Sequence, residues 1–481
     1  MASKKHTSIL RTENHIAGKW TGKGKGETVV RNKYTGRKLA TLPEATPAQV
    51  ERAIAAAAKA APDFAKWSAG KRQAHLEALR DLLEERKDAF VDLIVKEAGK
   101  PLDYARNELD RCLMTLKIAA AEAVRFCGEV VPLDFAAGEG KRAFTRRVPI
   151  GPIAAITPFN VPLNLVLHKL APALALGCPV LLKPAGQTPL TALAFMALVE
   201  EAGYPKGVLS TFTCDNEEAE LLVTDERIKF LSFTGSDTVG WYLKSRAEKK
   251  QIALELGGNA PVIVDASADV AKAAEQCAVG AFLYAGQICI STQRIFVVED
   301  VYAKFEQALV KAVKKLNVGD PSKAGVQVGP LIDAGHVERI SAWVKEAKDS
   351  GAKVLVGGRI RDKQHNLYAP TLLTDVPPDQ KVCTEEAFAP VAVLEKVANF
   401  DAAITRANDS RYGLQAGVFT NDFDHVCQAH EELEVGGVII NNVPGFRVDS
   451  MPYGGVKDSG LGREGLRYAM EEMSEPRLLV Y

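Results

Sequence analysis

Three side chains that can perform acyl chemistry lie far apart in the chain: Cys289, Glu255 and Asn160. Cys289 lies in Ala285-Gly-Gln-Ile-Cys289-Ile, between small and apolar residues. A buried cysteine is by default an inert small hydrophobe, whereas a nucleophile needs a local field or a helix terminus that lowers its pKa from about 8.5. The segment alone leaves both interpretations open.

Glu255 and Asn160 are open to two interpretations as well. Glu255 lies in an apolar run just before Gly257-Gly258, so we expect a desolvated carboxylate with a raised pKa that can act as a general base. A salt-bridged structural glutamate is the alternative. Asn160 lies between Pro158 and Pro162, whose rings fix the backbone, so its amide is a candidate oxyanion donor. It can equally be a turn-capping asparagine.

A candidate phosphate-binding turn follows the apolar run Phe230–Phe233. There Thr234-Gly-Ser236 precedes a predicted helix with Gly240 at its first full turn, and a helix N-terminus with small residues suits a pyrophosphate. Such turns are usually only structural. The G-x-G-x-x-G fingerprint, a Walker A sequence, H-E-x-x-H and G-x-S-x-G do not occur in the contexts they require, which disfavours a conventional Rossmann dehydrogenase and a serine hydrolase.

Taken together and in order, these segments closely resemble the aldehyde dehydrogenase superfamily over nearly the whole chain. The matching motifs are Glu97-Ala-Gly-Lys-Pro101, Thr157-Pro-Phe-Asn160, Lys183-Pro184, Phe233-Thr-Gly-Ser236, Glu255-Leu-Gly-Gly258, Gly286-Gln-Ile-Cys289, Glu385-Glu-Ala-Phe-Ala-Pro390 and Pro452-Tyr-Gly-Gly-Val-Lys-Asp-Ser-Gly-Leu-Gly-Arg-Glu464. Chance agreement of so many ordered motifs is very improbable.

The resemblance implies a mechanism. Cys289 would attack the aldehyde carbonyl, while the Asn160 amide and the Cys289 backbone N–H hold the oxyanion; removing one such donor typically costs about 3 kcal/mol. Collapse of the hemithioacetal would send hydride to the nicotinamide and leave a thioester. Glu255 would then activate water to release the acid.

The resemblance also implies a cofactor site for NAD or NADP. Lys183 would contact the adenosine ribose, Gly235, Ser236 and Gly240 would form the pyrophosphate turn, and Glu386 and Phe388 would lie against the nicotinamide ribose and ring. The complete predicted set is Thr157, Pro158, Phe159, Lys183, Gly186, Gly235, Ser236, Gly240, Leu256, Glu386 and Phe388.

The preference between the two cofactors stays open. Relatives often have a glutamate where this chain has Gly186, and its loss should permit a 2′-phosphate. However, the acidic loop Cys214–Glu220 would repel a phosphate unless it points away.

Arg447 is the most informative departure, because many relatives have an aromatic tunnel residue there. A guanidinium in an apolar tunnel is costly unless it meets an anion, and Arg111 is its candidate partner. We therefore expect a small anionic aldehyde such as a semialdehyde, a lactaldehyde-like or a phosphorylated compound. A structural pair of Arg447 with Asp449 or another acid is equally weighted. The complete predicted substrate set is Arg447, Arg111, Val161, His168, Ile288, Ile290 and Tyr453.

Three other functions compete. A CoA-acylating aldehyde dehydrogenase is disfavoured by Glu255, a base that is dispensable when a thiol attacks. A non-catalytic binding protein is expected to lose Cys289, Asn160 or Glu255, and all three are present. A cysteine hydrolase needs a histidine base, and none of the eight histidines lies in a matching motif.

Composition excludes further classes. Sixty basic and sixty acidic residues give no global field for nucleic acid or an anionic membrane. The eight cysteines form no CxxC pair or metal-like cluster, which predicts reduced cytoplasmic thiols and no metal site. The N-terminal Met1–Thr7 shows no secretory signal. The apolar stretch 163–182 is interrupted by polar residues and prolines that a bilayer span would tolerate poorly, so it predicts a buried helix and a buried strand.

Short β-branched runs alternate with helical patterns, which predicts an α/β protein with parallel strands. The expected strands are Ile153–Thr157, Pro179–Lys183, Phe230–Phe233, Pro261–Asp265 and Arg294–Glu299, and the clearest expected helices are Pro47–Trp67, Gln73–Ala98 and Leu190–Ala202.

The segment Gly128–Arg147 predicts an exposed two-stranded flap. The C-terminal Arg477–Tyr481 predicts a strand that needs a sheet edge, and another subunit is one source of such an edge. The resemblance implies an aldehyde dehydrogenase-like fold: a Rossmann-like NAD(P)-binding domain (1–125 and 148–256), an α/β catalytic domain (257–458), and an oligomerisation flap with the C-terminal strand (126–147 and 465–481). We expect a homodimer or homotetramer.

Overall fold

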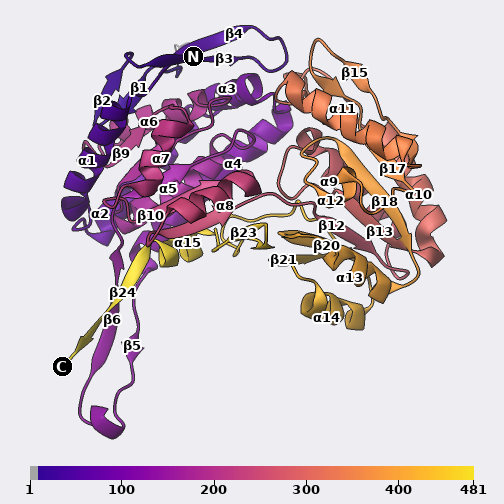
Figure 1. Ribbon diagram of the computed structural model, residues 1–481. Coiled ribbons are helices and arrows are strands. Elements are labelled where there is room, and N and C mark those ends of the chain that lie inside the picture. Colours follow the sequence, from indigo (N-terminus) through magenta and orange to yellow (C-terminus); the bar gives the residue numbers. More distant parts are fainter. Residues whose placement is uncertain (1–8) are drawn as a thin grey trace, which may run out of the picture.

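The computed structural model describes residues 9–481; the polar segment Met1–Thr7 lies outside the described residues. Two open sheets, each flanked by helices, form the body of the molecule, and a narrow flap projects from it (Figure 1). The helices are α1 (Pro47–Phe64), α2 (Ala69–Glu85), α3 (Lys87–Ala98), α4 (Leu102–Arg125), α5 (Asn164–Leu176), α6 (Leu190–Glu201), α7 (Asn216–Thr224), α8 (Asp237–Arg246), α9 (Val270–Phe282), α10 (Glu299–Lys314), α11 (Ala334–Asp349), α12 (Lys381–Thr384), α13 (Phe400–Asn408), α14 (Phe423–Glu432) and α15 (Leu466–Glu472).

The first sheet has eight strands in the order β2-β1-β9-β8-β7-β10-β11-β23, and its five strands from β9 to β11 are parallel. Its members are β1 (Asn14–Ile16), β2 (Lys19–Thr21), β7 (Ile153–Ile156), β8 (Val180–Lys183), β9 (Leu209–Thr211), β10 (Phe230–Thr234), β11 (Gln251–Glu255) and β23 (Gly460–Leu461). Alternate residues enter different cores: Ile153 and Ala155 pack with α2, α4, α5 and α6, whereas Ala154 and Ile156 pack with α1, α7 and α8. Burial on both faces explains the continuous apolar runs.

The second sheet has seven strands in the order β14-β17-β18-β13-β12-β20-β21, all parallel except β14. Its members are β12 (Pro261–Val264), β13 (Arg294–Val298), β14 (Lys353–Val356), β17 (Thr371–Thr374), β18 (Val391–Val397), β20 (Gln415–Phe419) and β21 (Gly437–Ile440). Val262 and Val264 face α9, α10 and α11, and Ile263 faces α13 and α14. Short two-stranded pairs join β3 (Gly26–Arg31) to β4 (Lys38–Glu44), β15 (Ile360–Asp362) to β16 (Leu367–Tyr368) and β19 (Tyr412–Gly413) to β22 (Val456–Lys457).

The five expected strands are confirmed to within about one residue at each end, and α1 and α6 match their expected segments. The oily stretch 163–182 is indeed a buried helix, α5, followed by the buried strand β8. Gln73–Ala98 is wrong as one helix: α2 ends and α3 begins around Arg86, whose φ of −110° and ψ of 13° interrupt the helix. Within residues 9–481, no helix combines the length and apolar character that crossing a bilayer requires.

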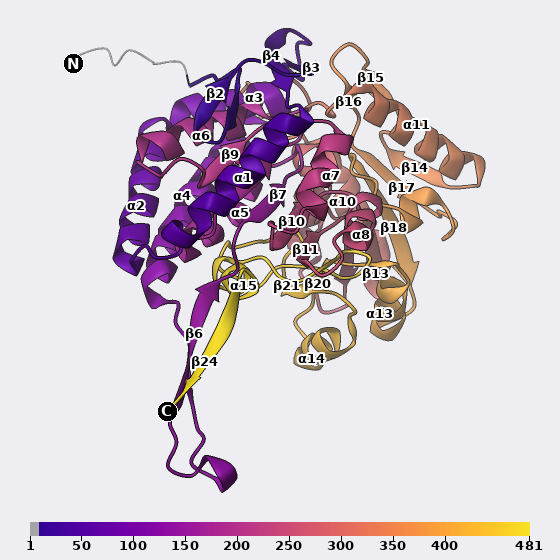
Figure 2. The ribbon, with the colours of Figure 1, turned by 60° about the vertical axis from the view of Figure 1, so that its left-hand side comes forward.

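The flap contains β5 (Val130–Val131) and β6 (Ala143–Pro149), and the C-terminal strand β24 (Ser474–Val480) joins it as a third strand (Figures 1 and 2). The C-terminal segment is a strand at a sheet edge, as expected, and the edge comes from β6 of its own chain and not from another subunit, because β24 pairs with β6 along its length. Apolar side chains of the flap remain outside, with Val130 84% and Leu478 55% exposed.

Candidate active site

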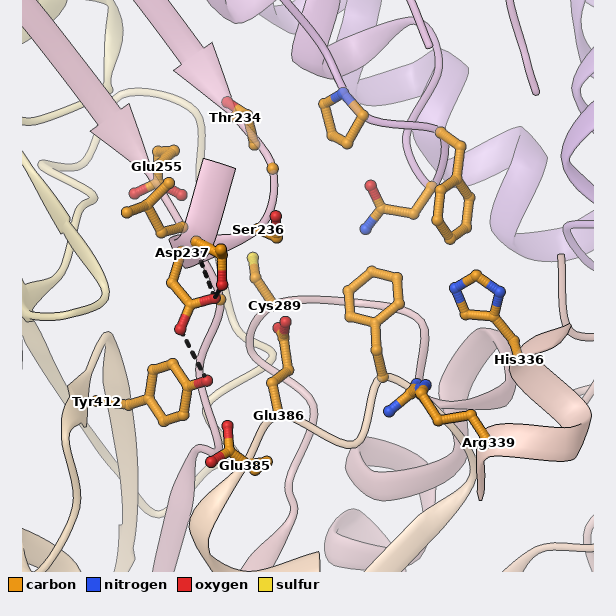
Figure 3. Close-up of a pocket in the computed structure, with 18 of the residues that line it drawn as sticks. Thr234, Ser236, Asp237, Glu255, Cys289, His336, Arg339, Glu385, Glu386 and Tyr412 are labelled. Atoms are coloured by element: carbon orange, nitrogen blue, oxygen red, sulfur yellow. Dashed lines mark hydrogen bonds between the residues drawn. The ribbon is translucent and has the colours of Figure 1, made fainter. Parts of the chain in front are cut away.

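The site lies where the carboxyl ends of β7, β10 and β11 meet the second sheet. Asn160, Ser236 and Glu255 end or follow these parallel strands, and such ends converge at one edge of a sheet. Cys289 enters from the loop between the 3₁₀ helix η2 (Leu283–Gly286) and β13. Together these residues line a cavity of about 530 Å³. Figure 3 shows Cys289 and Glu386 in its middle.

The cavity brings together ten of the predicted site residues. It contains the three predicted catalytic residues and seven predicted cofactor residues: Pro158, Phe159, Asn160, Gly235, Ser236, Glu255, Leu256, Cys289, Glu386 and Phe388. The predicted residues that do not line it are Thr157, Lys183, Gly186, Gly240, Arg111, Val161, His168, Ile288, Ile290, Arg447 and Tyr453. Of these, Ile290 and Tyr453 lie beside Cys289, and Arg447 lies over the Tyr453 ring.

The backbone before Cys289 makes an unusual turn that delivers the thiol to the cavity. Tyr284, Ala285 and Gly286 have φ values of 50°, 56° and 70°, all in the left-handed region. A Cβ at Gly286 would lie 2.2 Å from the Ala389 carbonyl oxygen, so only glycine fits. Strain held by surrounding structure is frequent at functional sites.

The surroundings of the Cys289 thiol favour its neutral form. Its Sγ lies 3.0 Å from the Tyr453 hydroxyl oxygen. Burial raises the pKa of the thiol to about 12, and the nearby Glu255 carboxylate adds to this rise. No neighbour in the described chain lowers this pKa below its ordinary value, so the condition for a nucleophilic thiolate, a local field that favours the anion, stays a prediction.

Asn160 points its amide at the nucleophile loop. Its Nδ2 donates to the Gln287 carbonyl oxygen at 2.8 Å, and its Oδ1 is buried without a hydrogen-bond partner in the described part of the chain. An amide nitrogen carries two N–H groups, so one of them remains free to donate. Asn160 does not cap a local turn, because its amide nitrogen bonds to Gln287, more than a hundred residues away in the sequence.

Glu255 ends β11 and is 4% exposed. Its Oε1 has no hydrogen-bond partner, and across residues 9–481 the carboxylate takes part in no ion pair, so the salt-bridged alternative does not hold. Burial raises the pKa of Glu255 well above its ordinary value, and repulsion from Glu464 raises it further. A carboxyl group in this state can act as a proton acceptor near neutral pH.

A buried charge network lies behind Glu255. Glu464 pairs with Lys169 at 3.2 Å and with Arg447 at 2.8 Å. Arg447 also donates to Nδ1 of His168 at 2.9 Å, and Nε2 of His168 lies 2.8 Å from Asp449. Burial opposes the charge of Glu464, but Lys169 and Arg447 outweigh it and lower its pKa to about 2.

This network decides the partners of the two predicted arginines. Arg447 meets Glu464 and neither Asp449 nor Arg111, whereas Arg111 pairs with Asp449 at 2.5 Å. Each arginine thus already has a carboxylate from the protein. The Nε of Arg447 is nevertheless buried without a partner in the described chain, which leaves one guanidinium N–H available.

Three of the remaining predicted substrate residues lie beside the thiol, and two do not contact it. Ile290 and Tyr453 belong to a small apolar cluster against which Ile288 and Cys289 pack. Val161 is half-buried and follows Asn160, and His168 is buried within α5.

The predicted cofactor residues differ in what they do. Ser236 is the N-cap residue of α8 and Gly235 precedes it, so this helix N-terminus faces the cavity. Gly240 lies inside α8, where a Cβ would approach Leu256 to 2.3 Å; it allows close packing and does not form the turn itself. Glu386 accepts a hydrogen bond from the Gly258 amide at 3.1 Å, and burial raises its pKa to about 8.

The adenosine end of the predicted site lies around Lys183 and Gly186, beside the acidic segment Cys214–Glu220. This segment is not the expected loop, because Asp215 is the N-cap residue of α7 and Glu218 lies in its first turn. Asp215 and Glu218 both contact Lys25, at 2.7 and 2.6 Å. Thr28, on the same N-terminal segment as Lys25, lies 3.7 Å from the position of a Cβ at Gly186. The charge of the acidic segment is therefore partly neutralised by Lys25.

Several cavity residues carried no signal in the sequence. These are His336, Arg339 and Trp343 on α11, together with Asp237, Arg411 and Tyr412. Figure 3 shows His336 and Arg339 across the cavity from Asp237 and Tyr412. The α11 residues lie on an ordinary amphipathic helix with no motif, so only folding reveals them.

Fold and cavity define a class of protein, a dinucleotide-dependent oxidoreductase with a cysteine at the centre of its site. The model of the aldehyde dehydrogenase family matches residues 20–479, and the chain belongs to this family. The chain is accordingly an NAD(P)-dependent aldehyde oxidoreductase, and its substrate is an aldehyde.

Similar proteins and solved structures support the assignment to the aldehyde dehydrogenase family. A 3-sulfolactaldehyde dehydrogenase of Priestia aryabhattai is 44% identical over 98% of each chain, and a lactaldehyde dehydrogenase of Methanocaldococcus jannaschii is 39% identical over 97% of this chain and 99% of the relative. The crystal structure of aldehyde dehydrogenase 21 from Physcomitrella patens in complex with the reaction product succinate has a TM-score of 0.94 at 41% identity, covering 98% of each chain. A betaine aldehyde dehydrogenase from Staphylococcus aureus in complex with NAD+ has a TM-score of 0.94 at 31% identity, covering 98% of this chain and 94% of that one.

Proposed function

We propose that the protein oxidises a small anionic aldehyde to its carboxylic acid with NAD+ or NADP+, through a thioester on Cys289 that water hydrolyses. The observation that carries this proposal is that Cys289, Asn160 and Glu255 line one cavity beside the N-terminus of α8. The relatives named above act on 3-sulfolactaldehyde and lactaldehyde, and one solved structure holds succinate.

The residues present fit a dinucleotide. A Cβ at Gly257 would lie 2.4 Å from the Glu386 carboxylate, so the wall beside the cavity is made of bare backbone. The N-terminus of α8, where Ser236 forms no side-chain capping bond, suits a pyrophosphate. We propose that Gly235 and Ser236 hold the pyrophosphate, Glu386 the nicotinamide ribose and Lys183 the adenosine ribose. When bound, the nicotinamide would accept the hydride that the former carbonyl carbon loses as the alkoxide collapses to the thioester.

In the first half-reaction Cys289 Sγ forms a bond to the carbonyl carbon as its own proton leaves to a base. The free N–H of Asn160 Nδ2 and the Cys289 backbone N–H donate to the oxygen, which becomes an alkoxide. The bond of Asn160 to Gln287 keeps the amide aimed at this position, so no reorganisation is needed when the charge develops.

In the second half-reaction Glu255 takes a proton from a water molecule that attacks the thioester carbonyl, and Cys289 leaves as the thiolate. The raised pKa of Glu255 suits this role, because a stronger base accepts the proton more readily. Retention of Glu255 supports water as the acceptor, against the alternative of a CoA-acylating enzyme.

For the anion we propose Arg447; Arg111 pairs with Asp449 and not with Arg447, but it belongs to the same network through His168 and stays a proposed substrate residue. The unpaired Nε–H of Arg447 supports this, since a buried guanidinium N–H without an acceptor is costly until an anion binds. The test is an aldehyde panel with both cofactors, read by NADH or NADPH absorbance. Arg447→Leu should raise KM for acidic aldehydes about tenfold or more over neutral ones of the same size, as loss of a charge-assisted hydrogen bond does. An equal loss for both would remove the assignment.

We also propose a homodimer or homotetramer that buries the flap, because its exposed apolar side chains and free β-strand edge need partners.

Three domains are proposed. Residues 1–125 and 148–256 form the NAD(P)-binding domain, residues 257–458 form the catalytic domain, and residues 126–147 and 465–481 form the oligomerisation flap with the C-terminal strand. A nucleophilic thiol must stay reduced, which supports a cytoplasmic location. Light scattering of the purified protein tests the assembly.

A further inference from the structure

We propose that the hydroxyl of Tyr453 is a hydrogen-bond donor to the Cys289 thiolate, which makes Tyr453 a further catalytic residue and not only a lining residue of the substrate site. This inference rests on the proposed nucleophilic role of Cys289. The oxygen of Tyr453 lies 3.0 Å from Sγ of Cys289, within the range of a hydrogen bond to sulfur.

The backbone holds Tyr453 firmly in this position. Its N–H donates to the Glu464 carbonyl oxygen at 3.0 Å, and the two residues form an antiparallel bridge in both directions. The side chain is 2% exposed, and its ring packs with Ile290 and Leu414. The contact with sulfur therefore joins two segments that are each fixed by their own surroundings.

Packing alone does not account for the hydroxyl. A phenylalanine would fill the same apolar cluster, whereas a buried hydroxyl is costly unless it forms a hydrogen bond. Along residues 9–481, Cys289 Sγ is the partner that the Tyr453 hydroxyl finds. The Tyr453 hydroxyl therefore forms its hydrogen bond with the nucleophile, Cys289 Sγ.

The direction of the bond follows from the groups involved. A thiolate carries no proton and can only accept, whereas a phenol can donate. Burial raises the pKa of Tyr453 well above its usual range, which favours the protonated phenol that can donate. The Arg447 guanidinium carbon lies 3.6 Å from the centroid of the Tyr453 ring, and a cation on that face makes the hydroxyl a stronger donor.

The charges around the thiol explain why a donor is needed here. Burial, Glu255 and Glu386 all favour the neutral thiol. Tyr453 is the neighbour whose hydrogen bond stabilises the anion directly, and Arg447 acts at longer range. The donated bond offsets part of the cost of placing a thiolate beside two carboxylates.

The test is Tyr453→Phe, which removes the hydroxyl and keeps the ring under Arg447. Iodoacetamide alkylation of the Cys289 peptide is followed by mass spectrometry from neutral to strongly alkaline pH, with no aldehyde or cofactor present. A hydrogen bond to a charged group of ordinary strength predicts a midpoint about one to two pH units higher and a labelling rate about ten- to a hundredfold lower at pH values below the midpoint. An unchanged midpoint would overturn the proposal.

Tyr302→Phe is the matched control, because it also removes a tyrosine hydroxyl bonded at 3.0 Å, to Thr374, far from the cavity. It should leave the Cys289 midpoint where it is. If Tyr453→Phe folds poorly, a ring-fluorinated tyrosine at position 453 replaces it: this better donor should lower the midpoint, and a midpoint that does not move refutes the idea equally. Alkylation of Cys289 requires no turnover. If a Cys289→Ser enzyme kept its dehydrogenase activity, the proposed function would be refuted, but the alkylation midpoints would still show whether Tyr453 donates to the thiolate.

Discussion

Replacing Glu255 by glutamine removes the proposed base while it preserves the size and shape of the side chain. Glu255 is 4% exposed, and its Oε1 has no hydrogen-bond partner among the residues that the structure describes. Burial, and then repulsion from Glu464, raise its pKa well above the ordinary value. The substitution therefore removes a proton acceptor without breaking a stabilising ion pair.

The expected kinetic effect falls on one half-reaction. A general base contributes about 10²- to 10⁴-fold, which is about 3 to 5 kcal/mol of activation free energy at roughly 1.4 kcal/mol per tenfold. Glu255→Gln should slow thioester hydrolysis by this factor and leave attack on the aldehyde much less affected. Stopped-flow absorbance should then show a burst of about one NADH per active site, followed by slow turnover.

The same change should increase stability at higher pH. Because the pKa of Glu255 is raised in the folded protein, its stabilising contribution is present below the unfolded pKa and is lost as pH rises through the folded value. Glutamine cannot ionise, so the variant lacks this loss. Its Tm should equal or exceed that of the wild type above neutral pH.

Two outcomes would refute this reasoning. One is an undiminished steady-state rate without a burst, and the other is a wild-type enzyme that turns over only when CoA is added. Glu472→Gln is the matched control, because burial also raises the pKa of Glu472, to about 7, although this residue does not line the cavity. It should show normal kinetics.

Two further predictions follow from the geometry. Asn160→Ala should lower kcat about 10²- to 10³-fold with little change in KM, because the oxyanion loses a donor that the Gln287 carbonyl holds in place; a change confined to KM would contradict the role. Lys25→Ala should leave Asp215 and Glu218 uncompensated and weaken NADP+ relative to NAD+ by about three- to tenfold at low salt, an effect that added salt should diminish. Equal KM changes for both cofactors would show that the acidic segment Cys214–Glu220 is remote from the 2′-phosphate.

The strands and the identity of the site were readable in the sequence for a local reason. Ile153 to Ile156 is apolar at every position because alternate side chains enter two different cores, and that requirement leaves a continuous run in the sequence. The motifs around Cys289, Glu255 and Asn160 combine small, apolar and polar residues in a fixed order along the chain. The one clear error in the helices, at Arg86, is a change of direction that leaves the amphipathic pattern intact on both sides.

Contacts between distant segments could not be read in the same way. For Arg447 the substrate and a structural acid were weighed equally, and the structure pairs it with an acid, Glu464 of the C-terminal segment, which the sequence did not single out, and with His168 of α5. The C-terminal strand was expected to need a sheet edge, with another subunit as one source, and it pairs with β6 of its own chain. Both outcomes depend on which surfaces the fold brings together.

The sequence by itself determined the α/β class, the buried strands, the family and the three residues proposed for catalysis, because periodicity and ordered motifs are properties of neighbouring residues. Only the tertiary structure decided that the Tyr453 hydroxyl meets the Cys289 sulfur and that α11 closes the cavity. Hydrogen bonds and ion pairs depend on side-chain positions to within an ångström, and between segments far apart in the chain those positions exist only once the sheets and helices have packed.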